Sequence, residues 1–122
     1  MKHTITLIPG DGIGPEVSSA VRQILQAAGV EIQWEEMPAR AEAERRGIDF
    51  IQAGVLESIH KNKVALKGPM ATAVAGGAPS INVALRKALE LYANVRPVKN
   101  LEGVQARYSN VDLVLIRENT ED

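Results

Sequence analysis

The chain has 122 residues, of which 45% are hydrophobic and 24% charged, a balance typical of one globular domain and not of a disordered segment. A net charge of −1, with one Trp, two Tyr and one Phe, offers neither the basic field nor the stacking platform that proteins use to bind nucleic acid. No run reaches the roughly 20 apolar residues of a membrane span, and the absence of cysteine excludes disulfides and thiolate chemistry.

The chain opens with a pattern typical of a strand, a loop and a helix. Residues 4–8 are apolar and β-branched, which predicts a buried strand, and the loop PGDGIGP ends it. Pro15 and Glu16 suit the first turn of a helix, and Gly29 suits its end. The glycines lack the spacing of a dinucleotide-binding GxGxxG motif and no Gly-Lys-Ser/Thr follows, so a tight strand-to-helix turn is the simpler interpretation.

The middle of the chain predicts shorter elements. Residues 30–34 alternate as a second strand, and residues 38–47 form a short polar helical stretch. Residues 51–60 predict a third helix and residues 64–66 a short strand. Residues 68–79 are small and glycine-bearing, and a loop of that length in a compact domain usually has a function.

The last third predicts one helix and two extended segments. A helix follows Ser80, which is a plausible N-cap, and its apolar stripe runs along one face. Asn82 and Arg86 are four residues apart and therefore share another face. Residues 93–98 read as extended and residues 111–117 as a strand. The alternation of helices with apolar strands predicts an α/β fold.

Three arginines and two neutral donors form the main candidate binding set. These residues are Ser80, Asn82, Arg86, Arg96 and Arg117. Arg96 and Arg117 lie in apolar strand-like segments, where a guanidinium is costly unless it meets a carboxylate or a ligand anion. Because the guanidinium fork matches carboxylates in pairs, three converging arginines would suit a dicarboxylate or tricarboxylate. The alternative is that Ser80 only caps its helix and Arg86 lies on a solvated helix face.

Other polar residues give weaker signals. Lys67, Thr72 and the glycine-rich residues 74–78 either wrap a ligand or form an ordinary loop, and the pattern does not decide between the two. The carboxylates that follow residue 117 either bind a divalent cation or form a polar segment after a strand. We assign no metal ligand from this pattern.

Four segments, in this order, resemble the isocitrate and isopropylmalate dehydrogenase family of β-decarboxylating oxidoreductases. They are IPGDGIGPE at 8–16, KGPMATAVAGG at 67–77, SINVALRKALELYANVRP at 80–97 and IRENTED at 116–122. The resemblance implies the family's own α/β fold, which is distinct from the Rossmann fold and is truncated here. Residues 1–122 would form a single unit, the N-terminal part of the family's large domain, with strand 111–117 crossing towards the small domain.

The resemblance also implies roles for individual residues. The implied substrate-binding residues are Ser80, Asn82, Arg86, Arg96 and Arg117, and the implied cofactor-binding residues are Lys67, Thr72 and Asn82. The arginines would neutralise the carboxylates of isocitrate, and Ser80 would hydrogen-bond the carboxylate that distinguishes isocitrate from related substrates. The family oxidises the 2-hydroxyl by hydride transfer to NAD+ or NADP+ and then releases CO2, while Mg2+ or Mn2+ stabilises the enolate. Ser-x-Asn-Val-x-Leu-Arg resembles the isocitrate branch, and the stretch from Tyr92 favours NAD. Homoisocitrate and isopropylmalate dehydrogenases are the alternatives.

Several features depart from the family pattern. Ala71-Thr72 stands where the family has two threonines, and Pro79 replaces the usual residue before the serine. The family's proton-transferring lysine and metal-binding aspartates have no counterpart in these 122 residues. We therefore expect no catalytic and no metal-binding residue in the chain, which would be an incomplete, inactive segment of a tricarboxylic acid cycle dehydrogenase.

The expected partners follow from composition and from the resemblance. The composition predicts no nucleic acid and no membrane, and the family implies isocitrate as the ligand and a homodimer. A non-catalytic binding or assembly module, such as a truncated paralogue or an engineered fragment, is the alternative. We expect the cytoplasm, or the mitochondrial matrix if a targeting segment has been removed.

Overall fold

The computed structural model describes residues 3–38, 40–47, 49–70 and 80–119. The chain divides into two compact units, Met1–Asn82 and Val83–Asp122, with the boundary inside helix α4 (Ile81–Ala88). That both units belong to one larger domain, with strand 111–117 crossing towards a second domain, stays a prediction.

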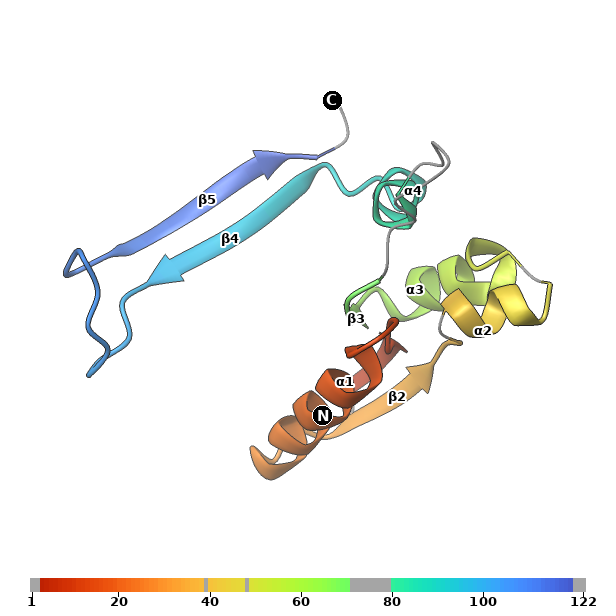
Figure 1. The fold of residues 1–122 in the computed structure, drawn as a ribbon, viewed down its shortest axis with the longest axis horizontal. Coiled ribbons are helices and arrows are strands. Elements are labelled where there is room, and N and C mark those ends of the chain that lie inside the picture. Colours follow the sequence, from red (N-terminus) through yellow and green to blue (C-terminus); the bar gives the residue numbers. More distant parts are fainter. Residues whose placement is uncertain (1–2, 39, 48, 71–79, 120–122) are drawn as a thin grey trace. The chain divides into compact units, whose positions relative to one another are not determined.

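The first unit is built on a three-stranded parallel sheet (Figure 1). The strand order is β2 (Ile32–Glu36), β1 (His3–Ile8) and β3 (Ala65–Lys67). Because β1 is the central strand, its second half is the most buried part of the sheet, and Leu7 and Ile8 are each 1% exposed. Parallel strands need crossover connections, which the helices provide. The α/β prediction is therefore confirmed.

Helices on opposite faces of the sheet cover it. The helical segments of this unit are α1 (Gly14–Ala27), α2 (Arg40–Arg45), the π-helical turn η1 (Ile51–Val55) and α3 (Leu56–Asn62). Glu36 of β2 pairs with Arg22 of α1 at 3.2 Å, and its neighbour Glu35 pairs with Lys61 of α3 at 2.8 Å. Consecutive residues of a strand point to opposite faces. The two ion pairs thus place α1 and α3 on opposite sides of the sheet.

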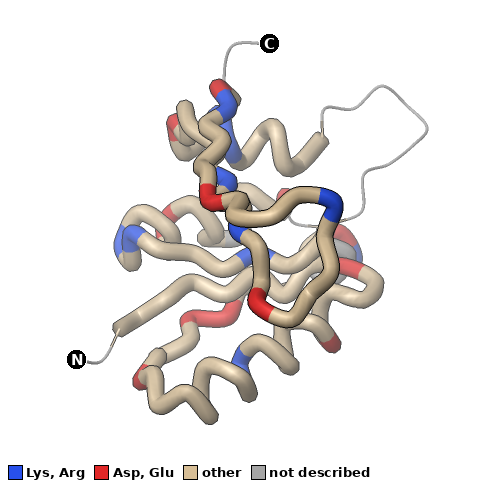
Figure 2. The backbone as a smooth tube through the Cα atoms, turned by 90° about the vertical axis from the view of Figure 1, so that its left-hand side faces the viewer, with Lys and Arg blue, Asp and Glu red and all other residues tan. Residues whose placement is uncertain are grey.

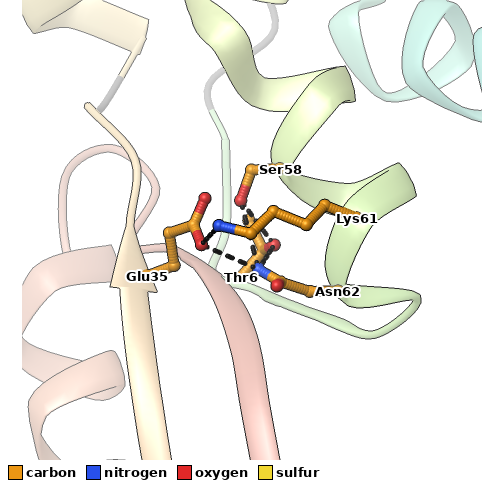
Figure 3. Close-up of polar contacts among 5 residues, drawn as sticks. All are labelled: Thr6, Glu35, Ser58, Lys61 and Asn62. Carbon is orange, nitrogen blue, oxygen red and sulfur yellow. Dashed lines mark hydrogen bonds and ion pairs between the residues drawn. The ribbon is translucent and has the colours of Figure 1, made fainter.

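A polar network joins α3 to the sheet (Figure 3). The buried hydroxyls of Thr6 and Ser58 lie 2.7 Å apart, and Asn62 Nδ2 donates to Thr6 Oγ1 at 2.9 Å and to Glu35 Oε2 at 3.3 Å. The hydrogen bond from Lys61, with smaller contributions from Ser58 and Asn62, lowers the pKa of the Glu35 carboxyl. Each buried polar group has a partner, so the network stabilises the contact between helix and sheet.

The second unit contains an antiparallel pair of strands. These are β4 (Ala93–Lys99) and β5 (Asp112–Glu118) (Figure 1). Their register places Pro97 opposite Val114. Asn100 N donates to Val111 O at 3.0 Å, so the even-numbered residues of β4 direct their backbone groups towards β5. Pro97, which has no N–H, therefore presents its nitrogen to the outer edge of β4.

The loop between β4 and β5 is fastened by one side chain. Asn100 Oδ1 accepts a hydrogen bond from Val111 N at 2.6 Å, and Asn100 Nδ2 donates to Tyr108 O at 3.1 Å. The strands expose apolar side chains on both faces, and a two-stranded sheet of this kind is marginally stable at best in water. The exposed apolar residues of the strands are Val95, Val98, Leu113, Val114, Leu115 and Ile116.

Two predicted boundaries differ from the structure: the end of the helix after Ser80 and the start of the second strand. The helix after Ser80 stops at Ala88, short of Tyr92, since Glu90 adopts a left-handed φ of 52° and Leu91 N bonds back to Arg86 O. Because glycine usually occupies such a position, nothing in the sequence pattern indicates that the helix ends there. The first helix ends at Gly29 as predicted, but Val30 N still bonds back to Leu25 O, so the strand predicted at 30–34 begins only at Ile32.

Candidate functional site

Three of the predicted site residues lie in or beside helix α4: Ser80 directly precedes it, Asn82 is in its first turn and Arg86 is in its last turn. Ser80, Asn82 and Arg86 are all half-buried, so the alternative of a fully solvated Arg86 is not what the structure has. The Asn82 Oδ1 atom is buried and accepts no hydrogen bond from the described residues. A buried acceptor of this kind costs about 1–3 kcal/mol unless a donor reaches it, so it fits an N–H or O–H group of a ligand.

The charge of Arg86 is also uncompensated. Among the described residues Arg86 forms no ion pair with a carboxylate, and the same is true of Arg96. A half-buried guanidinium without a carboxylate partner is suited to a ligand anion. The start of α4 therefore offers one hydrogen-bond acceptor and, one turn later, one cation.

The strands β4 and β5 bring Arg96 and Arg117 onto one face. The register pairs Asn94 with Arg117 and Arg96 with Leu115. Side chains of directly opposed residues lie on the same face, and residues two apart in a strand share that face. Asn94, Arg96 and Arg117 are consequently neighbours, and Arg96 Nε donates to Asn94 Oδ1 at 3.0 Å. The sequence predicted the two arginines but missed Asn94.

The surroundings of these two arginines differ from the sequence interpretation. Arg96 and Arg117 are exposed, and Leu115, opposite Arg96, is 51% exposed. The desolvation cost expected for an arginine in an apolar strand is therefore absent from the described chain.

The predicted cofactor-side residues are only partly located. Lys67 ends strand β3, is exposed, and donates from Nζ to Gly68 O at 2.7 Å. Thr72 lies outside the described residues. Of the three residues predicted to contact the cofactor, Asn82 therefore carries the clearest structural sign of a missing partner.

Two glycines hold the loops after β1 and β3 against each other. A Cβ on Gly10 would lie 2.1 Å from Pro69 O, and one on Gly68 would lie 2.0 Å from Pro9 O. Asp11 N donates to Pro69 O at 2.8 Å, which fastens the contact. Only glycine permits this approach of backbone to backbone. Both loops follow the carboxyl ends of adjacent parallel strands, where α/β proteins commonly bind ligands.

Other features of the described chain do not belong to the candidate binding set. Basic and acidic residues are scattered along the backbone (Figure 2), so attraction of an anion depends on individual cations. A hollow of about 680 Å³ between α1 and β2 includes Arg22 and Trp34 but none of the predicted site residues. The described residues contain no group of three His, Asp or Glu side chains able to hold a metal ion, and none of their helices is both long enough and apolar enough to cross a bilayer.

Comparison with known proteins decides the family. The model of the isocitrate/isopropylmalate dehydrogenase family matches residues 4–122. The chain belongs to this family. Its sequence is 52% identical over 118 residues to the mitochondrial NAD-type isocitrate dehydrogenase catalytic subunit 5 of Arabidopsis thaliana, covering 97% of the chain and 32% of the relative. It is 53% identical over 116 residues to the chloroplastic 3-isopropylmalate dehydrogenase of Solanum tuberosum, covering 95% and 32%.

A solved structure agrees with the family assignment. The crystal structure of isocitrate dehydrogenase from Methylococcus capsulatus matches with a TM-score of 0.84 and 47% identity, covering 98% of this chain and 35% of that one. The predicted family fold is thereby confirmed. The chain spans about a third of the length of the curated relatives it matches. The near-equal identities to an isocitrate and an isopropylmalate enzyme leave the branch to be argued from individual residues.

Proposed function

We propose that this chain supplies the carboxylate-binding part of an isocitrate dehydrogenase active site. The observation that carries the proposal is the shared face of Arg96 and Arg117 on β4 and β5. Arg86, which has no carboxylate partner among the described residues, would be the third cation. Three guanidinium groups match the three carboxylates of isocitrate in number, and the planar fork of each suits one carboxylate.

Ser80 is the residue that favours isocitrate over its relatives. We propose that its hydroxyl hydrogen-bonds the carboxylate that isopropylmalate replaces by an apolar group. A buried polar partner left unpaired by the wrong substrate discriminates more strongly than a change in apolar contact. The homoisocitrate and isopropylmalate branches remain the alternatives, and Ser80→Leu should lower the preference for isocitrate over 3-isopropylmalate.

The described residues have a feature that suits the family's dinucleotide cofactor and none that suits its divalent metal. A dinucleotide fits, because the buried Oδ1 of Asn82 lacks a donor that a bound nicotinamide amide or substrate hydroxyl would provide. Lys67 would lie beside the same cofactor, and NAD is proposed over NADP. A nicotinamide would accept the hydride from the substrate. For a divalent metal, the described residues contain no cluster of carboxylates or imidazoles. We derive no step through a metal in this chain.

The experiments separate binding from turnover. Titration calorimetry of the chain with isocitrate should show saturable binding that weakens in Arg96→Ala, and the absence of any saturable heat would overturn the proposal. Assayed with isocitrate, Mn2+ and NAD+ or NADP+, the chain should show no turnover above background. Turnover would contradict the view that the chain lacks the acid, base and metal-binding residues of the reaction.

A second candidate, a non-catalytic assembly module, rests on the exposed apolar residues of β4 and β5. Val95 is 60% and Ile116 72% exposed, and they lie opposite each other on one face. We propose that a second copy of the chain covers this face, in line with a homo-oligomer. Light scattering should give at least the dimer mass, and a monomer at high concentration would contradict this candidate. For the compartment, the cytoplasm stays a prediction, with the mitochondrial matrix as the alternative.

A further inference from the structure

Asn94 stands between the two arginines of β4 and β5 and has a defined contact with one of them. It is the register partner of Arg117 and precedes Arg96 by two residues. Its Oδ1 accepts the Nε hydrogen of Arg96 at 3.0 Å, and Asn94 itself is half-buried while Arg96 is exposed. The half-buried side chain of Asn94 therefore holds the exposed side chain of Arg96.

This contact restricts how Arg96 can meet a carboxylate. A guanidinium binds a carboxylate in two ways, either through Nε and one terminal nitrogen or through both terminal nitrogens. Because Asn94 already accepts the Nε hydrogen, Arg96 can bind a carboxylate only through its two terminal nitrogens. An arginine that is already oriented also loses less rotamer freedom when the anion binds.

We propose that Asn94 is a positioning residue, which holds the Arg96 guanidinium so that its two terminal nitrogens face a substrate carboxylate. The inference rests on the proposed function, because that function supplies the carboxylate. The amide Nδ2 of Asn94 has no hydrogen-bond partner among the described residues. The Arg117 side chain beside it carries only hydrogen-bond donors. This face therefore presents N–H groups and binds hydrogen-bond acceptors such as a carboxylate.

A contact between residues two apart in an exposed strand can also be a local surface contact without consequence, since exposed polar pairs contribute little to stability. The two interpretations differ in one measurable respect. A positioning residue acts through Arg96, so its effect on affinity vanishes once Arg96 is removed. A surface contact has no effect on affinity in either background.

The test is a double-mutant cycle of isocitrate affinity by calorimetry on the chain. Asn94→Ala should weaken binding about three- to tenfold, the cost of ordering one long side chain. The double variant Asn94→Ala/Arg96→Ala should bind as weakly as Arg96→Ala alone. Lys99→Ala is the matched control, because Lys99 lies on the other face in an exposed 3.1 Å ion pair with Asp112 and should change affinity less than twofold. An unchanged affinity in Asn94→Ala, or an additive loss in the double variant, overturns the inference.

A second readout separates failure of the inference from failure of the proposed function. The exchange of the Arg96 Nε proton with water, measured by NMR without ligand, should be slower in the unaltered chain than in Asn94→Ala. If that difference is found but the unaltered chain binds no isocitrate, the proposed function falls and the contact between Asn94 and Arg96 stands. If the two exchange rates are equal, the inference falls whether or not isocitrate binds.

Discussion

Replacing Gly68 with alanine should destabilise the first unit more than any exposed substitution nearby. The added Cβ would lie 2.0 Å from Pro9 O and 2.8 Å from Pro9 C, both of which are backbone atoms that no side-chain rotation can move aside. Since real Cβ contacts begin near 3.0 Å, the two loops must separate by about 1 Å. Two backbone hydrogen bonds of 2.8 Å, from Gly68 N to Ile8 O and from Asp11 N to Pro69 O, would then exceed hydrogen-bonding distance.

The expected magnitude combines these two effects. Overpacking costs about 1–3 kcal/mol and each of the two lost hydrogen bonds about 1 kcal/mol, so we expect a loss of about 3–5 kcal/mol in the free energy of unfolding. With a slope of about 2 kcal/mol per molar urea, the midpoint would fall by about 1.5–2.5 M. The assay is urea unfolding followed by far-UV circular dichroism.

A glycine of the facing loop, which follows β1, provides the control. Gly12 has a φ of 59° but no atom within 4 Å of its virtual Cβ, so Gly12→Ala should cost only the left-handed backbone term, about 1 kcal/mol. If Gly68→Ala lost no more stability than Gly12→Ala, the two loops would be able to separate freely. The reasoning that only glycine permits their contact would then be refuted.

Three further predictions concern hydrogen bonds described above. Because the pKa of Glu35 is lowered in the folded state, its stabilising effect is complete above the unfolded-state pKa of 4.5 and is lost as the pH falls through the folded-state pKa. Glu35→Gln should therefore flatten the fall in stability below pH 4.5, measured by thermal unfolding at several pH values. Asn100→Ala removes both side-chain bonds that fasten the loop between β4 and β5, and should accelerate amide hydrogen exchange in both strands. Ser58→Ala should cost about 1 kcal/mol, and its effect should be smaller in a Thr6→Val background, because the two hydroxyls share one hydrogen bond.

Each of these has a result that would contradict it. An unchanged pH profile in Glu35→Gln would mean that the ion pair with Lys61 does not couple to folding. Exchange rates unaffected by Asn100→Ala would show that the strands are held by other contacts. Strictly additive losses for Ser58 and Thr6 would remove the evidence for their coupling.

The sequence predicts the two arginines as site residues but cannot place them together. Arg96 and Arg117 are separated by twenty-one positions, and whether they share a face depends on the register of β4 and β5. A shift of one residue would put them on opposite faces. The register is set by the connecting loop and by Asn100, whose bonds to the backbone have no signature in the apolar pattern. For the same reason Asn94 went unnoticed until the pairing was known.

The elements themselves were largely predictable, with exceptions that have physical causes. Hydrophobic runs predict strand β1 and the helix from Pro15, and proline and glycine mark where these elements begin and end. The end of α4 did not, because Glu90 takes a left-handed conformation that sequence patterns associate with glycine. The role of Gly68 was also hidden, since it depends on which strands are neighbours in the sheet.

Pro97 makes the two outer edges of the β4 and β5 pair unequal. A further strand that approached β4 would meet a nitrogen without hydrogen at that position and lose one hydrogen bond of the ladder. Strand β5 contains no proline, so its outer edge can offer every donor and acceptor that faces it. Addition of a strand to this sheet is therefore favoured on one side only, and the asymmetry is set by a single imino acid next to Arg96.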